Sequence, residues 1–161
     1  MRAALVEARR AGARGEIPVG AVVVVGGRVV ARAGNASIRP PDPTGHAEIR
    51  ALRRAARRLG AYRLTDATLV VTLEPCLMCM GTAMSFFLGR LVYALPAPAD
   101  GASSVSEQWR PALGHPTTGG AYALPMVEKG VGEAEARALI ASWLDTGVSG
   151  GEADFARRTL G

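Results

Sequence analysis

The sequence TLEPCLMC at residues 72–79 contains the only two cysteines of this chain, Cys76 and Cys79. Their C-x-x-C spacing lets one helical turn or tight loop direct both sulfur atoms at a single metal ion. Upstream, HAE at residues 46–48 supplies His46 as a third ligand. Three protein ligands leave a tetrahedral zinc ion one open position for water, which is typical of a catalytic site. The two motifs together therefore predict a catalytic zinc site.

Glu48 lies two residues after His46 and is the candidate general acid and base. Zinc lowers the pKa of bound water from about 16 to roughly 7. A nearby carboxylate can take a proton from that water and pass it to a leaving amine. Positions i and i+2 of a helix point in different directions, so His46 can bind the metal while Glu48 approaches from the side. The combination of H-x-E with P-C-x-x-C is the signature of zinc-dependent nucleobase deaminases.

Two other interpretations of the cysteine pair remain open at this point. An isolated C-x-x-C pair can be a redox-active dithiol, although Pro75 in front of it and the HAE motif favour a metal site. A structural zinc site would need a fourth ligand, and the remaining candidate is His115. Its GHP setting at residues 114–116 is typical of an ordinary solvated loop histidine.

Length and composition indicate the general class of protein. With 161 residues, of which 48% are hydrophobic, residues 1–161 are expected to form a single domain with a sizeable core. No segment reaches the roughly 18 apolar residues needed to span a membrane, and charges interrupt the first ten positions, so no secretory leader is expected. Two cysteines committed to a metal agree with a reducing compartment. We therefore expect a cytoplasmic protein without a membrane partner.

The net charge of +5 is unevenly distributed along the chain. Residues 1–63 contain 13 arginines and only four acidic residues, whereas the remainder is net acidic. A basic half favours a polyanionic partner such as RNA. The alternative is that the arginines at positions 50, 53, 54, 57 and 58 only solvate the outer face of a helix.

Hydrophobic periodicity predicts helices and strands in alternation. Helices are expected over 2–11, from a cap at Thr44 to Gly60, from Pro75 to Gly89, over 133–144 and over 152–159. Strands are expected over 21–25, 28–33, 67–72, 90–94 and about 121–127. The two helices that carry the metal ligands should pack side by side on one face of the sheet. Residues 95–120, with four prolines, are expected to form a long variable loop between a core at 2–94 and a C-terminal strand and helices at 121–161. Trp109 in that loop is expected to anchor the surface, although with Arg110 it could stack on or clamp a base.

Over residues 2–94 the chain resembles the cytidine and deoxycytidylate deaminase superfamily, and most closely the tRNA wobble adenosine deaminases. The shared motifs are GEIPVGA at 15–21, DPTGHAEI at 42–49, YRL at 62–64 and TLEPCLMC at 72–79. The resemblance implies a three-layer α/β/α fold around a central five-stranded mixed sheet, a catalytic zinc ion and usually a homodimer.

The resemblance also implies roles for individual residues. His46, Cys76 and Cys79 match the zinc ligands, and Glu48 matches the residue that moves protons. Asn35 matches the asparagine that contacts the target nucleoside, and the backbone around Ala47 matches part of the base pocket. The implied reaction is hydrolytic removal of an exocyclic amino group from a nucleobase.

The identity of the substrate stays open. RNA-acting members typically show a polar segment, G-A-x-D-x-K-x-G-A, where this chain has ALPAPADGA at residues 94–102, with Ala97 and Ala99 replacing the aspartate and the lysine. Loss of charge there would weaken contacts to phosphates. Adenosine in a tRNA anticodon loop therefore competes with a free nucleobase or nucleoside of the guanine, cytosine or adenosine type. A non-catalytic, zinc-stabilised binding module is a third possibility, and the intact Glu48 argues against it.

Overall fold

Five strands and six helices make up the described part of the structure, a computed structural model that describes residues 1–108, 122 and 124–161. The strands are β1 (Gly20–Val25), β2 (Arg28–Gly34), β3 (Ala67–Leu73), β4 (Arg90–Leu95) and β5 (Met126–Glu128). The helices are α1 (Arg2–Gly12), α2 (Ala47–Leu59), α3 (Leu77–Ser85), α4 (Ser103–Glu107), α6 (Glu133–Leu144) and α7 (Gly151–Leu160).

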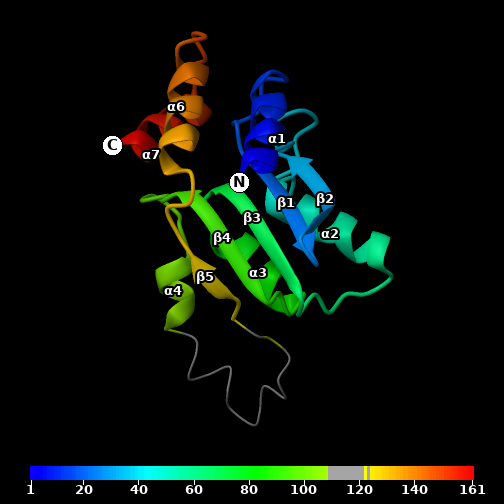
Figure 1. Cartoon of the computed structure of the whole chain (residues 1–161). Helices are drawn as coiled ribbons and strands as arrows, with labels where there is room; N and C mark the ends of the chain where they lie inside the picture. The colour runs from blue at the N-terminus through cyan, green and yellow to red at the C-terminus, as the bar shows by residue number, and fades with distance from the viewer. Residues whose placement is uncertain (109–121, 123) are drawn as a thin grey trace.

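The strands form one mixed sheet in the order β2-β1-β3-β4-β5 (Figure 1). Strand β1 runs antiparallel to both β2 and β3, whereas β4 runs parallel to its neighbours β3 and β5. Strands β1 and β2 form a hairpin. Its two connecting residues, Gly26 and Gly27, have φ angles of 55° and 73°, which glycine adopts without steric cost.

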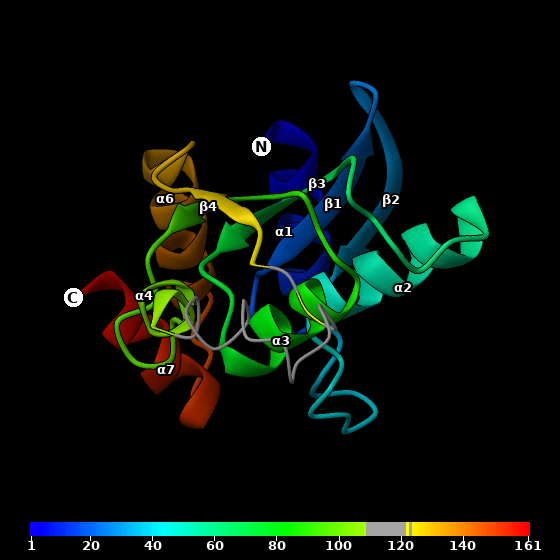
Figure 2. The same cartoon turned by 90° about the horizontal axis from the view of Figure 1, so that it is seen from below.

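Helices cover both faces of the sheet and give the predicted three-layer α/β/α arrangement (Figures 1 and 2). Helices α1 and α6 pack on one face, and α2 and α3 lie together on the other. Helix α7 packs against α6. The expectation that the two ligand-bearing helices share one face is therefore confirmed.

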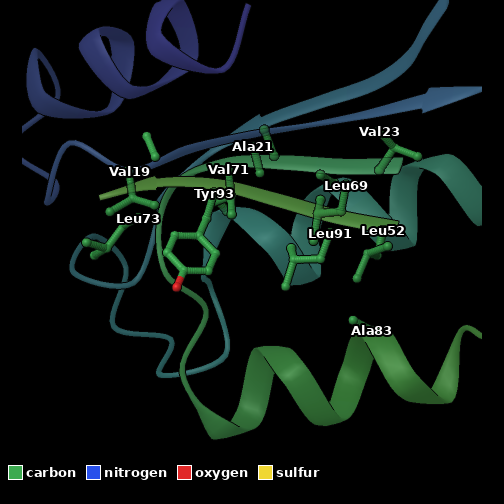
Figure 3. Packing of buried hydrophobic residues seen from close by; sticks show 14 of the residues in the cluster. Val19, Ala21, Val23, Leu52, Leu69, Val71, Leu73, Ala83, Leu91 and Tyr93 are labelled. Atoms are coloured by element: carbon green, nitrogen blue, oxygen red, sulfur yellow. The ribbon is translucent and has the colours of Figure 1, made fainter. Parts of the chain in front are cut away.

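Alternation along the strands directs apolar side chains to the two layers. Val22, Val70 and Val92 cluster with Ala4 of α1 on one face. On the other face, strand residues pack toward α2 and α3, as Figure 3 shows. The labelled residues there include Val23, Leu69, Leu91, Leu52 of α2 and Ala83 of α3. Burial of each large side chain contributes about 2 kcal/mol, so this layer fixes how α2 and α3 sit on the sheet.

Three arginines of α2 cover the open edge of the sheet by bonding to backbone carbonyls of the edge strand β2. The donors are Arg50, Arg54 and Arg58, and the acceptors are the carbonyl oxygens of Gly34, Arg32 and Val30, respectively. The arginines are four residues apart on the helix, a rise of about 6 Å, and the carbonyls are two residues apart on the strand, a rise of about 6.7 Å. Each arginine therefore lies opposite its own carbonyl. The interpretation that all five arginines of α2 only solvate a helix face is therefore wrong for these three, because they occupy carbonyls that another strand would use.

Replacing the middle arginine of this series tests its contribution. We expect Arg54→Ala to lower the free energy of unfolding by about 0.5–1 kcal/mol through loss of one partly exposed hydrogen bond. Backbone amides of β2 should also exchange faster with solvent. Urea unfolding and hydrogen exchange measure both effects. Arg53→Ala is the matched control, because the Arg53 side chain bonds to none of the described residues. Equal effects of the two variants would contradict the role of Arg54.

Three predicted helix boundaries were wrong. Thr44 does not cap α2, because its backbone N–H and its hydroxyl both donate to the carboxylate of Asp42, at 2.9 and 2.7 Å. Helix α3 begins after Cys76, not at Pro75, because the backbone at Cys76 is still extended (φ −71°, ψ 174°). It ends at Ser85, well before Gly89, and Phe87 beyond it has a φ of 53°.

The predicted loop at residues 95–120 contains the short helix α4, and the predicted strand near 121–127 is shorter, since β5 begins at Met126. Trp109, Arg110 and His115, for which roles were considered, lie outside the described residues. In the described part of the chain, no helix is both long and apolar enough to cross a membrane.

Candidate active site

The predicted site residues meet at one end of the sheet. Strands β2 and β3 both run antiparallel to β1, so their carboxyl ends lie at the same end of the sheet. Asn35 follows β2 directly, and Cys76 lies just beyond β3. His46 and Cys76 are also the residues that immediately precede α2 and α3. Two helix N-termini therefore converge here, and their unpaired N–H groups favour negative charge.

Close backbone contact brings His46 into place. Gly45 lies against the loop after β2, where a Cβ atom would be 2.1 Å from the carbonyl oxygen of Ala36. The backbone N–H of Ala36 donates to the carbonyl of Gly45 at 2.9 Å. A larger residue at position 45 would push this loop away, so the glycine of the TGHAE sequence sets the distance between Asn35 and His46.

The three predicted metal ligands form a compact triangle. The Nδ1 atom of His46 lies 3.7 Å from the sulfur of Cys76 and 3.5 Å from the sulfur of Cys79, and all three ligand atoms are within 4.8 Å of one another. In a tetrahedral site with a Zn–N bond of about 2.1 Å and a Zn–S bond of about 2.3 Å, nitrogen and sulfur lie about 3.6 Å apart. The donor set and its spacing therefore fit a zinc ion without rearrangement.

The charges at the triangle also favour a cation. A hydrogen bond from the Cys79 thiol lowers the pKa of Cys76 to about 4. The same bond, together with burial, raises the pKa of Cys79, and a hydrogen bond to Cys76 raises the pKa of His46. In the absence of metal the site thus holds a thiolate beside an imidazole, and a metal ion would replace the shared protons.

Glu48 lies in the same cavity as His46 and Cys76, with only 4% of its surface exposed. Burial raises the pKa of its carboxyl group to about 7 in the metal-free protein. Among the described residues, the group close enough to share a metal consists of the histidine and the two cysteines, without Glu48. Glu48 thus lies in the cavity beside the metal-binding group without belonging to it, and its role in proton transfer stays a prediction.

A cavity of about 200 Å³ opens over the triangle. Of the predicted site residues, Asn35, His46, Glu48 and Cys76 line it. Ala47 is fully buried as the first residue of α2 and is not among the described residues that line the cavity, so a role for its backbone stays a prediction. The volume is below the roughly 300–1,000 Å³ of pockets for drug-sized ligands and suits one planar base.

Sequence reasoning missed several residues of the cavity wall. Ile17, Val19 and Leu73 form apolar parts of the wall, and Phe155 reaches it from α7. Ile17 and Val19 belong to the GEIPVGA motif and could have been inferred from it. Phe155 gave no signal, because its spacing in α7 is that of an ordinary amphipathic helix. Its aromatic ring can pack against the face of a base.

Glu74, a half-buried residue that lines the cavity, fixes the loop after β4. The carboxylate of Glu74 accepts hydrogen bonds from the backbone N–H groups of Ala97 and Ser103, both at 3.1 Å, and from the Ser103 hydroxyl. This loop carries Asp100, an exposed residue that lines the cavity mouth and that sequence reasoning did not identify. The glutamate of the TLEPC sequence thus shapes the cavity without being a metal ligand.

Removal of one cysteine tests the metal centre. We expect Cys76→Ser to reduce bound zinc from about one ion per chain to a trace and to lower the melting temperature, because the ligands join the starts of α2 and α3. Elemental analysis and thermal unfolding with and without a chelator measure both. Ser85→Ala is the control, since Ser85 lies on the same helix and is exposed. A Cys76→Ser protein that keeps zinc and stability would show that the ligands are misassigned.

A catalytic metal bound by one histidine and two cysteines, with a buried glutamate beside it, defines the class of zinc-dependent nucleobase deaminases. The family model of the cytidine and deoxycytidylate deaminase zinc-binding region matches residues 1–95, and the chain belongs to this family. The matched segment contains every predicted site residue.

Individual relatives and solved structures agree with this family. A tRNA-specific adenosine deaminase of Agrobacterium fabrum is 50% identical over 102 residues, which are 63% of this chain and 67% of that protein. The structure of a tRNA:A34 deaminase superposes with a TM-score of 0.76 and 42% identity, covering 86% of this chain and 96% of the other. A guanine deaminase of Bacillus subtilis superposes with a TM-score of 0.59 and 32% identity, covering 66% and 71%. The matched residues of this chain span 67% of the length of the Agrobacterium fabrum protein, but only 7% of the length of a chloroplastic tRNA(adenine(34)) deaminase of Arabidopsis thaliana.

Proposed function

We propose that this protein is a zinc-dependent hydrolase that deaminates adenosine to inosine in tRNA. The observation that carries this proposal is the metal triangle with Glu48 beside it, in a chain 50% identical to a tRNA-specific adenosine deaminase. The match to the tRNA:A34 deaminase structure, which covers 96% of that chain, supports the same substrate. Those of the 13 arginines within residues 1–63 that bond to no backbone carbonyl add positive charge suited to phosphates.

The residues of the cavity divide the reaction between them. Zinc bound by His46, Cys76 and Cys79 would supply Lewis acidity and make water nucleophilic near neutral pH. Glu48 accepts a proton from the attacking water and delivers a proton to the exocyclic nitrogen. A C–O bond forms, the C–N bond breaks, and ammonia leaves while the ring keeps the oxygen. The apolar wall around Ile17, Val19 and Leu73 keeps other water away from the reacting carbon.

A free nucleobase or nucleoside is the second candidate substrate. The cavity of about 200 Å³ is sufficient for one base. Ala97 and Ala99 offer no charge to a phosphate, and the exposed carboxylate of Asp100 at the cavity mouth would repel one. The similarity to a guanine deaminase of Bacillus subtilis supports this alternative.

One assay separates the two substrates and tests Glu48. Ammonia release by the zinc-loaded protein is measured with an anticodon stem-loop containing adenosine and, separately, with free adenine, guanine, cytosine and their nucleosides. We expect turnover of the stem-loop alone. Glu48→Gln should keep its zinc and lose turnover by roughly 10²-fold or more, because proton transfer is removed.

The control for this assay is Glu135→Gln, a change of the same kind at an exposed position on α6. Turnover of a free base or nucleoside in place of the stem-loop would establish the second candidate. Full activity of Glu48→Gln would remove this residue from the mechanism. No ammonia release from any substrate by the zinc-loaded protein would contradict the proposed function.

We further propose that the protein is a cytoplasmic homodimer. The homodimer is supported by large apolar side chains on the outer surface of α3, where Leu77 is 51% exposed and Met78 is 36% exposed. Two unpaired cysteines that serve as metal ligands support a reducing compartment. Sedimentation equilibrium of the zinc protein should give twice the chain mass of 16.7 kDa. A mass of 16.7 kDa at micromolar concentration would contradict the dimer.

A further inference from the structure

Glu16 is a buried carboxylate whose function neither the metal site nor the proton transfer explains. It precedes β1 within the GEIPVGA motif and is only 2% exposed. Its two oxygen atoms accept hydrogen bonds from the backbone N–H groups of Ser37 at 2.9 Å, Ile38 at 3.1 Å and Arg39 at 3.0 Å. A fourth donor is the side-chain nitrogen of Asn35, at 3.2 Å. Glu16 therefore holds the loop after β2 and contacts Asn35, which lines the cavity.

The contact with Glu16 determines which way the Asn35 amide points. The Nδ2 atom of Asn35 donates to the Oε2 atom of Glu16 and, at 2.8 Å, to the hydroxyl of Ser37. An ionised carboxylate can only accept hydrogen bonds, so the nitrogen and not the oxygen of the amide must face Glu16. Both N–H groups of the amide are then engaged within the protein.

The remaining polar atom of Asn35 faces the cavity. Its Oδ1 atom accepts no hydrogen bond from any described residue. Within the described residues, no side-chain oxygen or nitrogen that is fully enclosed lacks a partner. Asn35 lines the cavity together with Glu48 and His46, so its Oδ1 atom must open into that space. Asn35 thus offers the cavity an acceptor, and both of its own donors are engaged within the protein.

We propose that Glu16 is a positioning residue that fixes the amide of Asn35 so that the site accepts a hydrogen bond from its substrate at this position. The group that binds there is a donor, either a hydroxyl of the sugar or an N–H of the base. This inference rests on the proposed deaminase function for its consequence in catalysis, whereas the orientation of the amide is a property of the free protein.

The orientation can be measured without any substrate. In the ¹⁵N-labelled zinc protein, both side-chain amide protons of Asn35 should be protected from exchange, and both should show contacts in nuclear Overhauser spectra, one toward Glu16 and one toward Ser37. Ser37→Ala should release one of these protons and leave the other protected. An Asn35 amide with two freely exchanging protons in the wild-type protein would overturn the proposal, whether or not the enzyme is active.

Exchanging the Glu16 carboxylate and the Asn35 amide tests whether the orientation of the amide matters for catalysis. The substrate is whichever one the wild-type protein turns over. Glu16→Gln should lower kcat/KM by roughly 10-fold to 100-fold, because the amide is no longer held in one orientation. Asn35→Asp should lower it further, since two carboxylates then face each other. The double variant Glu16→Gln/Asn35→Asp restores a donor opposite the acceptor at position 35 and still presents an oxygen to the substrate. Its new amide nitrogen also faces the backbone N–H groups of Ser37 and Ile38, so the recovery is only partial. It should recover at least tenfold over Asn35→Asp alone.

A purely structural role of Glu16 gives a different pattern. In that case the fold-losses in kcat/KM of the two single variants multiply in the double variant, and this result would overturn the proposal. An unchanged kcat/KM in Glu16→Gln would also overturn it. Zinc content should stay at the wild-type level in all three variants, since none of the changed residues is a metal ligand. A wild-type protein that releases no ammonia would count against the proposed function alone, because the amide measurement is independent of turnover.

Discussion

The structure depends on one constraint: one imidazole nitrogen and two sulfurs must lie within bonding distance of a single ion. His46 ends the segment that leads into α2, whereas Cys76 and Cys79 belong to the segment that leads from β3 into α3. Both helices must therefore begin at the same end of the sheet and lie on the same face. The apolar layer between the sheet and these helices provides this placement.

Two carboxylates, the buried Glu16 and the half-buried Glu74, hold loops of the cavity wall by the same physical means. Glu16 accepts hydrogen bonds from three consecutive backbone N–H groups after β2, and Glu74 accepts two from the segment after β4. A buried carboxylate is costly unless its oxygens are bonded, and a loop is costly to order unless its N–H groups are bonded. Each pairing offsets both costs. These hydrogen bonds position the walls that present Asn35 and Asp100.

The basic character of the first half of the chain has more than one physical origin. Arg50, Arg54 and Arg58 bond to the carbonyls of the edge strand, so part of the positive charge stabilises the sheet. Arg63 lies over the ring of Phe87 at 3.7 Å, where it contributes a cation–π contact. A count of arginines in the sequence therefore overstates the charge that is free to meet a polyanion, and the choice between RNA and a free base depends on the cavity mouth.

The sequence alone predicted the metal ligands and most helices and strands, because metal-ligand spacing and hydrophobic periodicity are local properties of a chain. The mixed sheet was an implication of the family resemblance, and the role of Glu48 in proton transfer stays a prediction. It did not determine where α3 ends, that Thr44 would bond to Asp42, or that Glu16 would orient Asn35 across 19 positions. The contribution of Phe155 to the cavity was equally hidden. These features follow from contacts between segments far apart in the sequence, which only the tertiary structure brings together, since no local pattern records which buried donor will meet which acceptor.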